Sequence, residues 1–193
     1  GGSAPMMEAL RRETHAGDVR AIAAVFGGEA SRILDRCSKG FTFEELLESA
    51  TAELGTMAIH EEMSGVRAAR KLCVLARHAF GHDPDAFRVD AFDAKSLRRA
   101  RDSLTENCTL RRVARAWKIS HRVFGQLQME ALDTRDPLAQ VQPEWNRLVI
   151  TLRQGREHQE RQIVVQGRDG LWPTTEASMA DLLDVRFTHL ALS

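Results

Sequence analysis

The sequence predicts a mainly α fold: a multi-helix N-terminal bundle, a helix-turn-helix-like pair of basic helices, and a short C-terminal β-hairpin followed by a helix. Three observations predict it. Apolar residues recur at helical spacing over much of the first 80 residues, positive charge gathers in one 28-residue window, and after residue 143 the hydrophobic period changes from about 3.6 residues to about 2. At 193 residues, the chain is long enough for one sizeable core or for two small domains.

The N-terminal bundle is predicted from four amphipathic segments: 18–26, 29–37, 41–55 and 56–80. The cleanest local signal is FTFEELLESATAELG, in which Thr42 and Glu45 form a capping box and Gly55 ends the helix. The long apolar stripe of 56–80 is the best candidate for a dimer interface. We therefore expect a homo-oligomer that pairs through this helix.

Two segments rich in Gly, Pro and Asp, 81–93 and 133–143, are predicted to be loops. Beyond the second, RLVITLRQ and RQIVVQ flank a polar turn and predict a β-hairpin near 147–166, and TTEASMADLLDV predicts a final helix. The expected organisation has four parts: a cloning remnant at 1–5, a helical interaction or dimerisation module at 6–80, a helix-turn-helix-like segment at 94–132, and a hairpin-plus-helix element at 144–193.

The positive charge is concentrated between residues 95 and 122. The whole chain has a net charge of zero, but this window holds nine basic and two acidic side chains. Such clustering is typical of a small surface that binds phosphates, whereas the preference for Arg over Lys is explained by coding bias alone. The window overlaps TLRRVARAWKISHRVFGQL (109–127), the stretch on which the functional interpretation depends.

This stretch has the features that two steeply crossing helices need. Val113 and Trp117 supply the inner face of the first helix, and Ala114 is the small residue at the crossing. Ile119 fills the turn, and Ser120 caps the second helix. The alternative interpretation is an amphipathic helix pair that shares this pattern by chance.

VARAWKISHRVFGQL resembles the helix-turn-helix of bacterial transcription regulators, over about 20 of the 193 residues. It departs from that pattern at Lys118, where the family has Gly, at a cost of up to about 1 kcal/mol. The resemblance implies base-edge contacts from the second helix: Ser120, His121, Arg122 and Gln126. It places other basic residues against phosphates: Arg98, Arg99, Arg101, Arg111, Arg112 and Lys118.

Other chemistry has little support in the sequence. His78 and His82 lie one helical turn apart, with Asp83 and Asp85 nearby, but a helix C-terminus favours His through the helix dipole alone. The three cysteines form no CxxC pair, and no nucleophile motif is present. We therefore expect no enzyme activity, no cofactor and no metal site.

The sequence thus predicts a sequence-specific DNA-binding protein, a transcriptional or replication regulator whose partner is double-stranded DNA. The alternative is a non-enzymatic helical interaction protein, an adaptor, effector or viral accessory protein, whose basic helices meet an acidic protein partner. The hairpin near 147–166 is either a wing of the DNA-binding unit or a separate interaction element. No apolar run is long enough to span a membrane and no signal peptide is seen, so a cytoplasmic location is expected.

Overall fold

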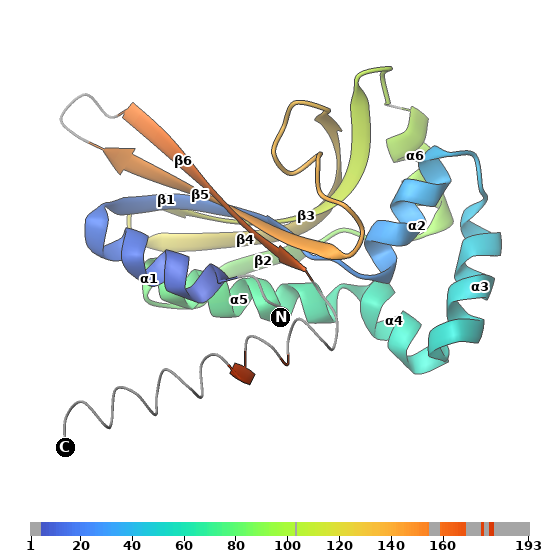
Figure 1. The fold of residues 1–193 in the computed structure, drawn as a ribbon, viewed down its shortest axis with the longest axis horizontal. Helices are drawn as coiled ribbons and strands as arrows, with labels where there is room; N and C mark the ends of the chain where they lie inside the picture. The colour runs from blue at the N-terminus through green and yellow to red at the C-terminus, as the bar shows by residue number, and fades with distance from the viewer. Residues whose placement is uncertain (1–4, 103, 155–158, 169–174, 176–177, 180–193) are drawn as a thin grey trace.

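The computed structural model describes residues 5–102, 104–154, 159–168, 175 and 178–179. Its centre is a six-stranded sheet in the order β2-β4-β3-β1-β5-β6, in which the β2–β4 pairing is parallel and the other four are antiparallel (Figure 1). The strands are β1 (Asp18–Val25), β2 (Ala86–Val89), β3 (Cys108–Ile119), β4 (Arg122–Asp133), β5 (Trp145–Gln154) and β6 (Gln159–Arg168).

Six helices accompany the sheet in the described part of the chain: α1 (Met6–Ala16), α2 (Glu29–Ser38), α3 (Phe43–Leu54), α4 (Thr56–Ser64), α5 (Val66–Phe80) and α6 (Ala94–Asp102). α1 and α5 cover one face of the sheet (Figure 1). Leu10 of α1 and Leu72 of α5 are fully buried against strand residues of this face. Ala114 and Ala116 of β3 are also fully buried in this core.

The remaining helices form a second apolar cluster at one end of the sheet (Figure 1). Ile33 and Leu34 of α2 lie at its centre with Leu110 of β3, and Phe43 meets Phe92 edge to face at 5.8 Å. This cluster fixes the N-terminal end of α2 beside the end of β1.

The opposite face of the sheet is covered at one end by the β4–β5 connection. Leu138, Ala139 and Val141 of this connection pack on Val25 and Val149. The rest of the face carries a mixture of polar and apolar side chains that no helix of the described chain covers.

The mainly α prediction is wrong, because the fold is α/β with a mixed sheet. The segment 18–26 illustrates the reason: it forms the central strand β1, with β3 on one side and β5 on the other. A strand buried on both faces is a nearly continuous apolar run, which periodicity cannot separate from a short helix.

The helix-turn-helix prediction is also wrong, because residues 108–133 form a β-hairpin. β3 and β4 pair without interruption from Cys108↔Asp133 to Ile119↔Arg122. Ser120 does not cap a helix but opens the two-residue turn with φ of 55°, and Ile119 is 58% exposed instead of filling a core. Trp117 stacks on Phe124 across the strands, at 5.9 Å between ring centroids.

Several local predictions are confirmed. α3 has the capping box of Thr42 and Glu45, and Gly55 follows its last residue. The hairpin near 147–166 is β5–β6, whereas its tip at 155–158 and most of the expected final helix lie outside the described residues. The segment 56–80 is divided at Gly65 into α4 and α5, and the loop expected at 81–93 contains the edge strand β2.

The expected parts 6–80, 94–132 and 144–193 stay a prediction, but the sheet takes strands from each: β1, β3 with β4, and β5 with β6. The apolar side of α5, which was expected to form a dimer interface, packs on the sheet through Leu72, Leu75 and Ala76. Within the described ranges, no helix is long and apolar enough to cross a membrane.

Candidate functional site

Two glycines shape the turn that joins β1 to α2. The backbone of β5 and the segment before it approaches Gly27 so closely that a Cβ there would lie 2.9 Å from the Pro143 carbonyl oxygen. The Gly27 N–H donates to Oδ1 of Asn146 at 2.8 Å, and Asn146 is 1% exposed. Gly28 has φ of 138° and ψ of −168°, a conformation that side-chain-bearing residues rarely adopt. The turn is therefore held rigidly in an unusual backbone conformation, which is typical of functional sites.

The carboxylate of Glu62 packs against this turn. A Cβ at Gly28 would lie 3.1 Å from Oε1 of Glu62, a contact so tight that the carboxylate would have to shift by a few tenths of an ångström. Glu62 comes from the last turn of α4, immediately before the break at Gly65. The end of α4 thus presents an acid to the N-terminal end of α2.

Arg112 of β3 holds the end of α4 in place. Its guanidinium donates to the carbonyl oxygens of Glu62 at 2.7 Å and Met63 at 3.0 Å, and it lies 4.9 Å from the centroid of the Phe92 ring. Arg112 is 6% exposed; burial lowers its pKa, while the nearby Glu62 carboxylate acts in the opposite direction. Gly65, with φ of 78°, leaves space for the guanidinium of Arg112, because a Cβ at Gly65 would lie 2.6 Å from Nη2 of Arg112.

Lys71 of α5 reaches the other side of the same turn. Its ammonium nitrogen lies 5.2 Å from the centroid of the Phe26 ring, a cation–π contact with the residue that precedes Gly27. Among the described residues, no carboxylate forms an ion pair with this ammonium group. Its hydrogen-bond donors are therefore available to a bound molecule.

Glu29, the first residue of α2, adds a second acid. Burial raises the pKa of this carboxyl, the ion pair with Arg32 at 3.6 Å lowers it, and the charges of Glu53 and Glu62 raise it further. A hollow of about 250 Å³ opens beside Glu29 between α2 and α3 and also touches Pro143. We call the turn of residues 26–28 with Glu29, Glu62 and Lys71 the Gly–Gly site.

Chemically, the Gly–Gly site combines carboxylates with an unpaired ammonium group around one backbone turn. A carboxylate binds a substrate amino group, and an ammonium group binds a carboxylate or a hydroxyl oxygen. The arrangement therefore fits a small molecule that carries both an amino group and an acid or hydroxyl group.

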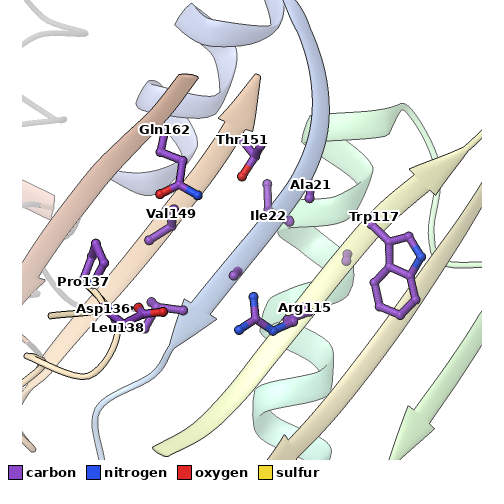
Figure 2. Close-up of a pocket in the computed structure, with 12 residues that line it drawn as sticks. Ala21, Ile22, Arg115, Trp117, Asp136, Pro137, Leu138, Val149, Thr151 and Gln162 are labelled. Atoms are coloured by element: carbon purple, nitrogen blue, oxygen red, sulfur yellow. Dashed lines mark hydrogen bonds between the residues drawn. The ribbon is translucent and has the colours of Figure 1, made fainter. Parts of the chain in front are cut away.

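A second hollow, of about 260 Å³, lies on the open face of the sheet (Figure 2). Its lining includes two charged residues, and both are already engaged. Arg115 donates two hydrogen bonds to Glu130, at 2.8 and 2.6 Å, which raise the pKa of Arg115; Asp136 accepts one from the Leu138 N–H at 2.7 Å. Because both charged groups of its lining already have partners, this hollow is less suited to bind a reacting molecule than the Gly–Gly site.

The residues expected to contact DNA do not gather on one surface. Arg98, Arg99 and Arg101 lie on α6, close in sequence to the start of β3. A second group lies at the far end of the hairpin: Lys118, Ser120, His121 and Arg122. The two groups lie toward opposite ends of the β3–β4 hairpin, whose strands have 12 residues each.

The three remaining residues of the DNA prediction lie within β3 and β4. Gln126 lies in the middle of β4, paired with Arg115. Arg111 and Arg112 are buried, at 9% and 6% exposed. The assignment of these residues to DNA contacts loses its basis with the helix-turn-helix.

The residues considered for a metal have structural partners. Nδ1 of His78 lies 3.1 Å from the Val74 carbonyl oxygen, and Asp83 pairs with Arg77 at 2.6 Å. Asp85 accepts a hydrogen bond from the Val123 N–H at 2.7 Å. The described part of the chain contains no group of three or more His, Cys, Asp or Glu residues that could hold a metal ion.

Sequence reasoning missed the Gly–Gly site. It left Gly27 and Gly28 between the two amphipathic segments 18–26 and 29–37, and it gave no role to Lys71 within 56–80. The available signal was a Gly-Gly pair between an apolar run and an amphipathic helix, which marks a close backbone approach.

The family model of homoserine dehydrogenase matches residues 5–183 of the chain. Among solved structures, a homoserine dehydrogenase from Thiobacillus denitrificans is similar at a TM-score of 0.77 and 22% identity, over 98% of this chain and 44% of that one. A hyperthermophilic archaeal homoserine dehydrogenase in complex with NADPH has a TM-score of 0.73 and 21% identity, over 97% of this chain and 53% of that one. No curated protein matches the chain in sequence.

A putative homoserine dehydrogenase from Archaeoglobus fulgidus is similar at a TM-score of 0.72 and 20% identity, over 96% of this chain and 56% of that one. The chain thus spans about half the length of the solved structures that it matches. These findings overturn the resemblance to helix-turn-helix regulators, the DNA-binding function and its DNA partner, and the alternative of a helical adaptor. The prediction of a non-enzymatic chain is wrong too, because the matching family is one of dehydrogenases.

Proposed function

The chain belongs to the homoserine dehydrogenase family, and from this premise we propose that it is the substrate-binding part of an NAD(P)-dependent oxidoreductase that acts on homoserine or a closely related amino alcohol. The observation that supports the proposal most is the Gly–Gly site, where Glu62 and Lys71 flank one rigid turn. Homoserine carries an amino group, a carboxylate and a primary hydroxyl, so it matches the chemistry of this site.

In this proposal each side chain of the Gly–Gly site has one role. Glu62, held by Arg112 through the backbone of α4, accepts hydrogen bonds from the substrate amino group. Lys71 donates a hydrogen bond to the hydroxyl oxygen at C4 and orients it. The substrate carboxylate lies toward Arg32 and Arg36, which line the hollow beside Glu29.

The dinucleotide itself does not fit the Gly–Gly site. A dinucleotide-binding turn presents free N–H groups at a helix N-terminus to the pyrophosphate and has the sequence G-x-G-x-x-G. This chain has no such motif, and Glu29 and Glu62 present carboxylates at the N-terminal end of α2, which repel a pyrophosphate. We therefore propose that residues outside this chain bind most of the dinucleotide. We also propose that the protein acts in the cytoplasm.

The test is hydride transfer in the natural full-length protein. Oxidation of homoserine by NAD⁺ or NADP⁺ removes a hydride from C4 and a proton from the hydroxyl, and yields the 4-aldehyde and the reduced dinucleotide. We expect the absorbance of the reduced nicotinamide to rise only when homoserine is present. Lys71→Met should lower kcat at least about a hundredfold, an effect expected when a group that touches the reacting atoms is removed.

Lys95→Met is the control, because Lys95 is an exposed lysine of α6 that should leave the rate unchanged. Absence of dinucleotide reduction with homoserine in a folded protein would refute the proposal. Equal rates for the wild type and Lys71→Met would remove Lys71 from the site.

A further inference from the structure

The first half of α5 carries three basic side chains on one side of the helix: Arg67, Arg70 and Lys71. Residues three and four apart in a helix are neighbours, with roughly 5–6 Å between their Cβ atoms. Arg67 and Arg70 are exposed, whereas Lys71 is half-buried and reaches the ring of Phe26 in the Gly–Gly site. We call the three residues the basic face of α5, and this face begins at the Gly–Gly site.

The two arginines of the basic face have no partner within the described residues. No carboxylate of those residues forms an ion pair with Arg67 or Arg70, and no hydrogen bond holds either guanidinium. By contrast, Arg77 in the last turn of the same helix pairs with Asp83 at 2.6 Å. The first turn of α5 contains no acidic residue, so the cations there oppose the helix dipole without compensation. Their position costs stability and gains no contact in the described part of the chain.

The basic face is open to a bound molecule. Val74, which lies on the same side of the helix one turn beyond Arg70, is 47% exposed. The buried residues of α5 point away from this face and into the core against the sheet: Leu72, Leu75 and Ala76. A ligand can therefore approach both guanidinium groups from solvent.

The proposed reaction determines which molecule comes close to the basic face. Hydride transfer requires the nicotinamide ring to lie against C4 of homoserine, and in the proposed function Lys71 binds the hydroxyl group on that carbon. In the dinucleotide, a single ribose separates the nicotinamide from the pyrophosphate. Side chains one helical turn from Lys71 are therefore in the right range to contact the pyrophosphate.

The chemistry of the two arginines fits this group. A guanidinium presents its N–H donors in a planar fork and binds phosphate oxygens in pairs through charge-assisted hydrogen bonds. The two negative charges of a pyrophosphate match the two positive charges of Arg67 and Arg70. Glu29 and Glu62 at the neighbouring turn repel the same group, so the arginines supply an attraction that the turn lacks.

From these observations we infer that Arg67 and Arg70 bind the pyrophosphate of the nicotinamide dinucleotide. The inference rests on the proposed function, because the position of the nicotinamide follows from the role of Lys71 at homoserine. It gives this chain a part in cofactor binding, beside the residues outside the chain that bind most of the dinucleotide. The contacts to substrate and cofactor then meet on one helix.

Equilibrium binding to the natural full-length protein tests the inference without turnover. The fluorescence of NADPH and of NADH is titrated with the wild type, Arg67→Gln and Arg70→Gln, and circular dichroism checks folding. Each substitution removes a charged donor and should raise the Kd of both dinucleotides about tenfold or more. Arg99→Gln is the matched control and should bind as the wild type does, because Arg99 is an exposed arginine of α6, which packs on β4 and α3.

Steady-state kinetics of homoserine oxidation separate the cofactor role from a role in substrate binding. Both variants should raise the KM of the oxidised dinucleotide and leave the KM of homoserine unchanged. Unchanged Kd values in both variants, with homoserine oxidation intact, would overturn the inference and leave the proposed function standing. Weaker binding of NADPH with normal binding of NADH would also overturn it, because the arginines would then contact the 2′-phosphate, which NADH lacks. If the folded wild type binds neither dinucleotide, the inference and the proposed function fail together.

Discussion

At the scale of single residues, the geometry of the candidate site depends on glycines that other parts of the chain approach closely. Gly65 and Gly81 share a left-handed backbone, with φ of 78° and 89°, but their surroundings differ. A Cβ at Gly65 would lie 2.6 Å from Nη2 of Arg112, whereas a Cβ at Gly81 would meet nothing within 4 Å. Alanine substitutions at the two positions therefore distinguish the energetic cost of backbone strain from that of steric overlap.

We expect Gly81→Ala to lower the free energy of unfolding by about 1 kcal/mol, the cost of a left-handed backbone for an alanine. Gly65→Ala carries the same strain and should lose a further 1–3 kcal/mol or so through overpacking against Arg112. Urea denaturation of both variants measures the difference. Equal losses would mean that the space beside Gly65 is open.

The acids of the Gly–Gly site predict a pH effect. Because burial and the charges of Glu53 and Glu62 raise the pKa of Glu29 in the folded state, the folded protein favours its protonated form. The resulting stabilisation is fully present below the pKa of the unfolded chain and is lost as the pH rises through the folded pKa. A carboxyl titration by NMR should find the pKa of Glu29 above 4.5, and Glu62→Gln should lower it. A pKa of Glu29 unchanged in Glu62→Gln would contradict the proximity of the two acids.

At the scale of elements, the β3–β4 hairpin explains why the sequence was misinterpreted. Arg and Ala have high helix propensity, and β3 contains five of them in 12 residues. β3 pairs with β1 and β4, and its Ala114 and Ala116 are completely buried in the core under α1 and α5, which propensity alone cannot anticipate. Local signals were more reliable: the capping box of α3 depends on Thr42 and Glu45 alone and was predicted correctly.

The hairpin and a helix-turn-helix predict opposite effects of a substitution at Ile119 on stability. Ile119→Asp should change stability by less than about 0.5 kcal/mol, because Ile119 is 58% exposed at the end of β3. Ala116→Leu should cost about 1–3 kcal/mol, because Ala116 has no exposed surface. Thermal denaturation of both variants decides between the two structures, and a severe loss for Ile119→Asp would contradict the hairpin.

At the scale of the whole molecule, one sheet connects segments that looked separate in the sequence. β1 lies between β3 and β5, although about 90 and 120 residues separate it from them along the chain. Such long-range pairings leave no trace in local periodicity. The helices α2 and α3, the helical character of 56–80 and the C-terminal hairpin could be predicted. The sheet and the Gly–Gly site, which depends on contacts of Gly28 with Glu62 and of Gly27 with Pro143, could not.

A single sheet predicts a single unfolding transition. In a Trp172→Phe variant, tryptophan fluorescence reports on Trp117 and Trp145 in the sheet, and far-ultraviolet circular dichroism reports largely on the helices. We expect both signals to give the same denaturation midpoint, as in cooperative unfolding of one unit. Two separated midpoints would show instead that helices outside the sheet unfold independently of it.

The most direct test of the central proposal is the binding of homoserine to this chain, measured by isothermal titration calorimetry and by amide shifts in NMR. We expect binding with the largest shifts at Gly28 and Glu29, and at least tenfold weaker binding in Glu62→Gln. Glu61→Gln, a change at the exposed neighbouring residue, should bind as the wild type does. No binding, or binding with shifts away from the Gly–Gly site and equal affinity in both variants, would contradict the proposal.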